Sequence, residues 1–460
     1  MVTRNGGLHD TRRYCYKKTL EPLSTIPEWI TLEHEAAEIL TQQELHGWYF
    51  DERSAWQLAS TLRQELEKVN QLLRDRHPFV AGPVFTPKRD NRTQGYVAGT
   101  GYTEKHKHCG ELIEIQQCSF TRLKELNTQS RDHISWILQT FHGWTPTQKT
   151  PTGKPIIDEP ILKEIGTETA LAFLQILTIT KMLGMISEGA NAWLKLSTSA
   201  SRIHHHCSVA TSTFRCAHRN PNLAQVPSDS RFRELFLPTP GQVMVAADLS
   251  GIELRMLSHF LARYDDGRYA DILLNGDIHQ VNADKIGISR KLVKTVTYAF
   301  LYGAGDEKIG HSYDKLLSSK NAKKKGKEIR AAYIDAIDGL DKLLASIKTA
   351  SERGYIKAID GRKIMVDSPH KALNYCLQGN SAILAKRWML INQQNIKELN
   401  LCCSQLAFIH DELQFECANE QAADLCSSLV FSSLAAGEYY NLRIRIDAES
   451  KTGNNWSETH

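Results

Sequence analysis

The sequence lacks any large excess of charge of one sign. It carries 56 lysines and arginines against 52 aspartates and glutamates, a formal net charge of +4. Residues 1–20 account for that excess, because five cations there stand against one anion, Asp10. The five cations are Arg4, Arg12, Arg13, Lys17 and Lys18. A protein that is basic throughout is excluded, so nucleic-acid binding would need a segregated positive surface.

Long apolar runs are also missing. The most apolar stretch, residues 170–186, is interrupted by Gln175, Thr178, Thr180 and Lys181. This pattern predicts a buried helix rather than a membrane span. The N-terminus has charges but no apolar segment with a cleavage-like site after it, so we expect no secretory signal and no membrane partner.

The ten cysteines have no regular spacing, which favours reduced thiols in a cytosolic compartment over a disulfide framework. Two short segments are rich in histidine and cysteine. The first contains His106, His108, Cys109 and Cys118, and the second is His204, His205, His206 and Cys207. Neither has the paired spacing of a zinc site, so we interpret both as clusters of surface polar residues and keep structural zinc as the alternative.

Periodicity divides the chain into two kinds of region. Residues 1–27 resemble an irregular arm, and apolar residues at helical spacing then predict a helix from Thr31 to Gly47 and a longer one through residues 58–73. Proline, glycine and charged residues between about 77 and 130 predict a surface excursion. Helices are expected over 130–142 and 158–195, and strands and helices alternate afterwards. The order predicts a mixed α/β protein.

Two places in the C-terminal half put carboxylates at strand ends. Residues 242–247 are β-prone, and Asp248 follows them directly, just before a helical pattern. Residues 406–417 form two β-prone runs broken by His410, Asp411 and Glu412, which predicts a hairpin. Carboxylates at strand ends are common metal ligands. Each also has a structural interpretation, because Asp248 could cap a helix and Asp411 could form a turn.

A third element is a helix with a cationic stripe. Ser289 can cap a helix on which Arg290, Lys294 and Tyr298 follow one another at four-residue steps along one face. Such a stripe suits a polyphosphate below a stacked sugar or base, because arginine supplies forked donors, lysine a point charge and tyrosine a flat face. Alone, it could equally be an exposed cationic face.

Together these elements resemble a known family. The three motifs of family A DNA polymerases are closely similar to DLSGIELR at 248–255, RKLVKTVTYAFLYG at 290–303 and HDE at 410–412, in that order. The replicative polymerases of podovirus-type bacteriophages are similar at LNGDIH (274–279), IDGRKIMVDSPHKALNY (359–375) and PNLAQVP (221–227). The resemblance implies a template-directed DNA polymerase that extends a primer with deoxynucleotides, in the cytoplasm of an infected bacterial host.

The resemblance also implies a right-hand fold. By that comparison residues 1–29 are a basic arm, 30–150 the thumb, 151–262 the first part of the palm with the first motif, 263–385 the fingers with the second, and 386–460 the second part of the palm with the third.

The resemblance assigns the catalytic metals. Asp248 and Asp411 match the two aspartates that hold two Mg²⁺ ions, and the backbone carbonyl of Leu249 is a further ligand. Glu412 matches a neighbouring acidic position, and we expect it to have a supporting role.

The nucleotide and DNA contacts follow in the same way. Arg290 and Lys294 match the residues that hold the triphosphate, Lys294 also stabilises the leaving pyrophosphate, and His279 is a second phosphate contact. Tyr298 matches the aromatic beside the incoming nucleotide, and Glu253 matches the residue that excludes a ribose 2′-hydroxyl. The residues that match primer–template contacts are Arg215, Asn374, Gln378 and His410.

Departures from the family limit these expectations. No segment resembling the family's exonuclease domain precedes residue 29, so we expect no proofreading in this polypeptide and leave open a separate exonuclease or processivity subunit. Phe214 stands where the family usually has glycine. The thumb excursion that captures thioredoxin in phage relatives is shortened here, which puts thioredoxin binding in doubt. The alternatives are a single-subunit RNA polymerase, which Glu253 argues against, and a catalytically inactive DNA-binding subunit.

Overall fold

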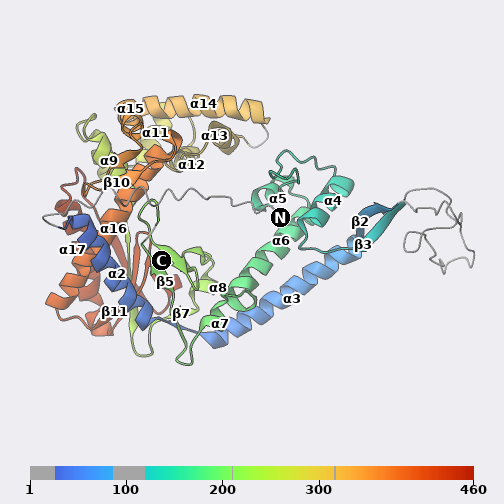
Figure 1. Cartoon of the computed structure of the whole chain (residues 1–460), viewed down its shortest axis with the longest axis horizontal. Coiled ribbons are helices and arrows are strands. Elements are labelled where there is room, and N and C mark those ends of the chain that lie inside the picture. Colours follow the sequence, from blue (N-terminus) through green and yellow to red (C-terminus); the bar gives the residue numbers. More distant parts are fainter. Residues whose placement is uncertain (1–25, 86–119, 210, 315–316) are drawn as a thin grey trace, which may run out of the picture. The chain divides into compact units, whose positions relative to one another are not determined.

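The computed structural model describes residues 26–85, 120–209, 211–314 and 317–460 (Figure 1). Nearly all of the expected N-terminal arm and the whole first histidine–cysteine segment lie outside these residues. The chain divides into two compact units, one built from residues 1–52 and 196–460 and the other from 53–195.

The unit of residues 53–195 is mainly helical, as predicted. Its helices are α3 (Glu52–Arg76), α4 (Arg131–His142), α5 (Glu159–Ile165), α6 (Glu168–Leu183), the π-helix η1 (Gly184–Glu188) and α7 (Trp193–Leu196). Ser130, Asp158 and Thr167 cap α4, α5 and α6 by accepting backbone hydrogen bonds, which explains where each helix starts. Phe173 and Ile176 of α6 are fully buried in a core with Leu73 of α3.

The helical stretch from Glu168 to Leu196 is long and apolar enough to cross a membrane by those two criteria alone. Six apolar or small residues of α6 are buried inside the unit, as in the core helix that the sequence predicts for residues 170–186. The stretch between 77 and 130, predicted as a surface excursion, contains two strands that the sequence did not identify: β2 (Phe79–Phe85) pairs antiparallel with β3 (Phe120–Glu125). Phe79 and Leu123 are among the exposed large apolar residues, which agrees with a surface position.

The other unit is built on a four-stranded antiparallel sheet of order β11-β12-β8-β13. These strands are β8 (Val243–Leu249), β11 (Cys403–Ile409), β12 (Glu412–Cys417) and β13 (Ala448–Gly453). α17 (Ala422–Tyr439) packs on β8 and β13, and α2 (Glu28–His46) packs on β11 and on α16 (Ala372–Glu398). Figure 1 shows α16 and α17 beside this sheet. β12 is buried along its whole length although polar and apolar residues alternate in it, so its polar side chains are buried and hydrogen-bonded within the protein.

Smaller elements complete this unit. β4 (Arg202–Ile203), β1 (Trp48–Phe50) and β7 (Phe236–Leu237) form one sheet, and two hairpins are β5 (His206–Ser208) with β6 (Ala217–Arg219) and β9 (Tyr355–Lys357) with β10 (Lys363–Met365). The remaining helices include α8 (Ser230–Arg233), α9 (Ile252–Leu261), α10 (Arg268–Asn275), α11 (Ile278–Ile286), α12 (Arg290–Leu301), α13 (Asp306–Tyr313), α14 (Ser319–Ala336), α15 (Leu340–Ser351) and α18 (Trp456–Thr459).

The predicted strand–helix and hairpin patterns are confirmed with one correction. Asp248 does not open a helix, because it is the penultimate residue of β8. The chain turns at Gly251, whose φ of 55° is left-handed, and α9 starts at Ile252. This puts the Asp248 carboxylate at the end of the sheet rather than on a helix cap.

Candidate active site

Neighbouring strands bring the two predicted aspartates together. β12 pairs directly with β8 in a register that places Glu412 opposite Asp248, and Asp411 immediately precedes Glu412 in the turn. The backbone amide of Leu249 donates to the carbonyl of Asp411 over 3.0 Å, so the two strand ends are bonded to each other. The positions 248 and 411, far apart in sequence, therefore meet at one end of the sheet.

The electrostatics of this end favour a bound cation. Partial burial and the negative charge of Asp411 and Glu412 raise the pKa of Asp248 to about 7. Burial and the charge of Glu253 raise the pKa of Asp411 to about 6, although Arg215 acts in the opposite direction. Among the described residues these are the carboxylates with a resolved upward shift. The cost of holding both as anions would be relieved by a divalent cation with oxygen ligands.

Glu412 has a different environment from its neighbour. Its side chain is 6% exposed, and Oε1 accepts from Trp456 Nε1 over 2.9 Å while Oε2 lies 2.9 Å from His460 Nδ1. Burial acts to raise the pKa of Glu412, but the hydrogen bonds from His460, Gln414 and Trp456 outweigh it, so the pKa is lowered. The carboxylate is thus ionised and already hydrogen-bonded within the protein.

A second group of polar side chains adjoins the aspartates. Arg215 Nη2 donates to Glu253 Oε1 over 2.7 Å, and the hydroxyl of Tyr302 donates to the same oxygen over 3.1 Å. His410, at a left-handed φ of 61°, has its pKa lowered by burial and by the nearby Arg215. Arg215, Glu253 and His410 therefore lie beside the aspartates, and Tyr302 is a further member that the motif comparison did not supply.

The predicted cationic stripe lies on α12. Ser289 caps this helix by accepting from the amide of Leu292. Arg290 Nε donates to Asp277 Oδ2 over 2.6 Å, and this ion pair is half-exposed. Within the described residues Lys294 is exposed and has no ion pair. The ring centroids of Tyr298 and His279 are 6.3 Å apart.

The C-terminal member of this stripe, Tyr298, lies near the carboxylates. Burial and the charges of Glu253 and Asp411 raise the pKa of Tyr298, so its hydroxyl lies in their field. His279, from the first turn of α11, is 8% exposed, and burial lowers its pKa. The arrangement leads from a cationic surface on α12 to the two aspartates.

Comparison with known proteins agrees with this geometry. The family model described as "DNA polymerase family A" matches residues 102–458. The DNA-directed DNA polymerase of Enterobacteria phage T3 is 31% identical over 94% of this chain and 70% of its own length. The chain belongs to DNA polymerase family A. The prediction of a DNA-directed DNA polymerase is confirmed.

Other relatives of this family A polymerase agree. The DNA-directed DNA polymerase of Escherichia phage T7 is 30% identical over the same shares of the two chains. The polymerase domain of Pol1 from M. smegmatis, solved with DNA primer–template and dNTP, has a TM-score of 0.71 at 20% identity and covers 93% of this chain and 70% of its own. The predicted mixed α/β polymerase fold is thereby confirmed.

Two of the expected DNA-contact residues lie on α16 of the polymerase. Asn374 and Gln378 are one turn apart on this helix and are partly buried. Asn374 Oδ1 has no hydrogen-bond partner within the described residues. The helix packs against α9, which carries Glu253, and against α12.

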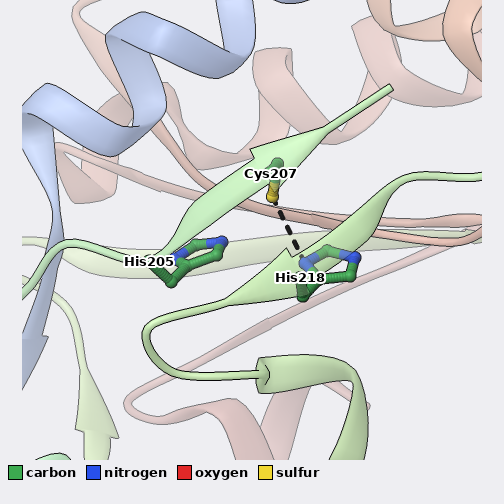
Figure 2. Close-up of side chains that lie close together, drawn as sticks. All are labelled: His205, Cys207 and His218. Carbon is green, nitrogen blue, oxygen red and sulfur yellow. Dashed lines mark hydrogen bonds between the residues drawn. The ribbon is translucent and has the colours of Figure 1, made fainter. Parts of the chain in front are cut away.

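The interpretation of residues 204–207 as surface polar residues is wrong for two of the four. His205 is fully buried and Cys207 is 9% exposed. They lie with His218, 7% exposed, in one cluster, and the three ligand-type atoms are within 4.8 Å of one another (Figure 2). The sequence reasoning missed His218 because its contribution depends on the pairing of β5 with β6, which places Cys207 opposite His218.

Proposed function

We propose that this chain extends the 3′ end of a primer with deoxynucleotides, directed by a template strand, at the site formed by Asp248 and Asp411. One observation carries the proposal: the ends of β8 and β12 bring two aspartates with raised pKa values together beside α12. Members of family A are metal-dependent, which agrees with such a carboxylate pair.

The residues fit two Mg²⁺ ions, held by Asp248, Asp411 and the carbonyl of Leu249. All are hard oxygen donors, and the raised pKa values indicate anions with too little compensation inside the protein. When bound, two such ions lower the pKa of the attacking 3′-hydroxyl and neutralise charge on the triphosphate and the leaving group. Glu412, which is hydrogen-bonded to Trp456 and His460, would hold the turn in place.

The protein's own residues would then bind and orient the substrates. Arg290 and Lys294 would hold the triphosphate, with Lys294 neutralising or protonating the departing pyrophosphate, and His279 would add a third phosphate contact. Arg290 must leave Asp277 to do so, since the two now form an ion pair. This exchange is inexpensive because the pair is half-exposed.

Glu253 and Tyr298 would select the sugar. The Glu253 carboxylate accepts from Arg215 and Tyr302, which fixes its position where a ribose 2′-hydroxyl would otherwise lie. Tyr298 would lie against the nucleotide near its 3′ position. This steric and polar exclusion favours a DNA polymerase over a single-subunit RNA polymerase, and the intact aspartate pair argues against an inactive subunit.

The DNA contacts and the assignment of domains are part of the same proposal. Arg215, Asn374 and Gln378 would contact minor-groove acceptors that all correct base pairs share, and His410 would contact the primer terminus. We propose the thumb at 30–150, the palm at 151–262 and 386–460 and the fingers at 263–385, with residues 1–29 as a basic arm. We place the reaction in the cytoplasm of an infected bacterium, which the phage relatives support.

We also propose that the 460-residue chain does not shorten primers. The described residues offer one pair of neighbouring carboxylates whose pKa values are both raised, and we assign that pair to polymerisation. Proofreading would then come from outside these 460 residues, and a separate exonuclease or processivity subunit stays open, with thioredoxin in doubt. Incubation with an end-labelled mismatched primer tests this: shortening that survives further purification would contradict it.

Primer extension with matched variants tests the main proposal. We expect Asp248→Asn and Asp411→Asn to abolish extension while leaving primer–template affinity largely intact, because affinity comes from phosphate contacts elsewhere. Glu449→Gln is the matched control, since Glu449 pairs with Asp248 in register but has no proposed role. Extension with ribonucleotides in preference to deoxynucleotides would contradict the proposal.

A further inference from the structure

The buried cluster of His205, Cys207 and His218 has an arrangement that follows from strand geometry. Because side chains alternate along an extended chain, His205 and Cys207 point to the same face, while His204 and His206 point away and bind Glu44. Cys207 on β5 lies opposite His218 on β6. His205, just before β5, Cys207 on β5 and the cross-strand neighbour His218 therefore converge inside the core, as Figure 2 shows.

The distances in the cluster are close to those of a coordination sphere. Cys207 Sγ lies 3.2 Å from His218 Nδ1. A tetrahedral zinc ion with bonds of ~2.3 Å to sulfur and ~2.0 Å to nitrogen holds those two atoms ~3.6 Å apart. All three ligand atoms already lie within 4.8 Å of one another, so a shift of about an ångström would complete the set.

Hydrogen bonds alone do not satisfy these side chains. His205 Nδ1 and His218 Nε2 are buried and have no partner within the described residues. Burial lowers the pKa of His205 to about 3 and that of His218 to about 4, so both rings are neutral and have a lone pair to offer. The nitrogens that face the cluster are the other two, His205 Nε2 and His218 Nδ1. Three ligand-type side chains gathered in the core beside two buried carboxamides are unusual unless something binds them.

A fourth ligand is at hand on α2. The carboxamide nitrogen of Gln43 lies 3.1 Å from His205 Nε2 and 3.5 Å from Cys207 Sγ, and Gln43 Oε1 accepts from Gln405 Nε2. Among the residues that the structure describes, the oxygen of Gln405 is buried without a hydrogen-bond partner. If both carboxamides turn over, Gln43 presents its oxygen to the cluster and donates its nitrogen to Gln405 Oε1.

We propose that His205, Cys207 and His218 bind one structural zinc ion, with the carboxamide oxygen of Gln43 in the fourth position. The balance is simple: the thiol of Cys207 loses its proton to solvent, the thiolate and two neutral imidazoles bind Zn²⁺, and no electron is transferred. This proposal does not depend on the polymerase mechanism, because the cluster shares no ligand with the aspartate pair.

The position of the cluster suggests what the ion would do. The ring of His218 meets the ring of His410 edge-on, with centroids 6.1 Å apart, and His410 precedes Asp411 in the turn. A metal that fixes the His218 ring would therefore restrict the movement of His410 and of the turn that contains Asp411. The zinc would be a positioning element of the fold and would not touch the substrate.

Metal content of the purified full chain is the first test. We expect about one zinc per chain, measured by inductively coupled plasma mass spectrometry after expression with added zinc, and less than about a tenth of that in Cys207→Ser. Cys417→Ser is the matched control, because Cys417 is a fully buried thiol outside the cluster. Zinc retained equally in Cys207→Ser, or absent from the wild-type chain, would overturn the proposal.

A second measurement does not require the variants to fold. The metal-stripped wild-type chain, titrated with Co²⁺ in excess Mg²⁺, should develop a thiolate-to-cobalt charge-transfer band that saturates at one ion. X-ray absorption of the zinc form should show one sulfur and otherwise nitrogen or oxygen ligands. No charge-transfer band, or a zinc shell without sulfur, would overturn the proposal. Both readouts are independent of polymerase activity, so they can fail while the polymerase assignment stands.

Discussion

The candidate active site and the buried cluster belong to one unit of the chain but differ in the charge and burial of their side chains. Asp248 and Asp411 are carboxylates close together at a sheet end, and burial and neighbouring negative charges raise their pKa values. His205 and His218 are neutral rings in the core, and burial lowers their pKa values. Hard oxygen donors thus lie at least partly exposed at the sheet end, whereas soft sulfur and nitrogen donors are enclosed.

This difference shows that each site contains polar groups that lower the stability of the folded chain while no ligand is bound. The aspartates cost folding free energy as long as no cation is bound, which is typical of a site built for a ligand. The nitrogens that face the cluster are His205 Nε2, which contacts Gln43, and His218 Nδ1, which contacts Cys207. A metal would relieve repulsion between carboxylates at the first site and would replace neutral contacts at the second, so its exchange with solvent would be rapid at the first and slow at the second.

The largest expected effect comes from removing one carboxylate of the active site. Asp248→Asn or Asp411→Asn should lower the single-turnover rate of nucleotide addition by at least ~10³-fold, about 4 kcal/mol on the barrier. The shape of the side chain is kept, so the loss would reflect charge. A variant with a near-normal rate would remove the residue from the metal assignment.

A smaller effect is expected on the discrimination between ribonucleotides and deoxynucleotides. Glu253→Ala should increase ribonucleotide use relative to deoxynucleotide use by roughly 10- to 100-fold, because it removes the carboxylate that Arg215 and Tyr302 hold. The ratio of kcat/KM for the two nucleotides measures this. Tyr302→Phe is a useful companion, since it removes one hydrogen bond and should have a partial effect. Discrimination that stays constant in Glu253→Ala would mean that another residue excludes the 2′-hydroxyl.

The ion pair between Arg290 and Asp277 allows a test in which the variant should bind the nucleotide more tightly than the wild type. Asp277→Asn keeps an oxygen for capping α11 but removes the negative charge that now holds Arg290. We expect KM for the nucleotide to fall by up to about fivefold, because exposed pairs contribute at most about 1 kcal/mol. Arg290→Ala should raise KM instead. If KM rises in both variants, Asp277 helps to bind the nucleotide and does not compete for Arg290.

The smallest effect concerns stability and pH. The folded pKa of Asp248 lies above its unfolded value, so the folded state binds more protons between about pH 4 and pH 7, and the free energy of unfolding falls as pH rises through that window. Without divalent ions, Asp248→Asn should therefore gain thermal stability over the wild type as pH rises. Differential scanning calorimetry at pH 5 and pH 8 measures this difference. A gain that shrinks with rising pH would contradict the electrostatic account.

The sequence was a good guide where chemistry follows from order along the chain. Ser289 and the four-residue steps of Arg290, Lys294 and Tyr298 are local properties, so the helix was predictable from spacing. The hairpin around Asp411 was predictable for the same reason. The resemblance to the family then joined Asp248 to Asp411, which spacing alone could not do.

The parts that the sequence did not predict depend on pairing between distant segments. β2 and β3 are joined across 34 residues that lie outside the described part of the chain, and the proline and glycine within β2 are residues that strands usually lack. His218 joins Cys207 only because β5 and β6 pair in one register. Tyr302, just after α12, reaches Glu253 of α9 from 49 positions away, and both helices pack on α16. In each case the missing information was register rather than residue type.

The central claim is that Asp248 and Asp411 together hold the catalytic divalent ions. Its most direct test is the number of Mn²⁺ ions, a spectroscopic substitute for Mg²⁺, bound to a complex of the chain with a dideoxy-terminated primer–template and the next correct nucleotide. Electron paramagnetic resonance of free Mn²⁺ gives this number without any turnover. We expect two ions per complex in the wild type and in Glu449→Gln, and a loss of at least one in Asp248→Asn and in Asp411→Asn. Two ions bound with unchanged affinity in both aspartate variants would contradict the account.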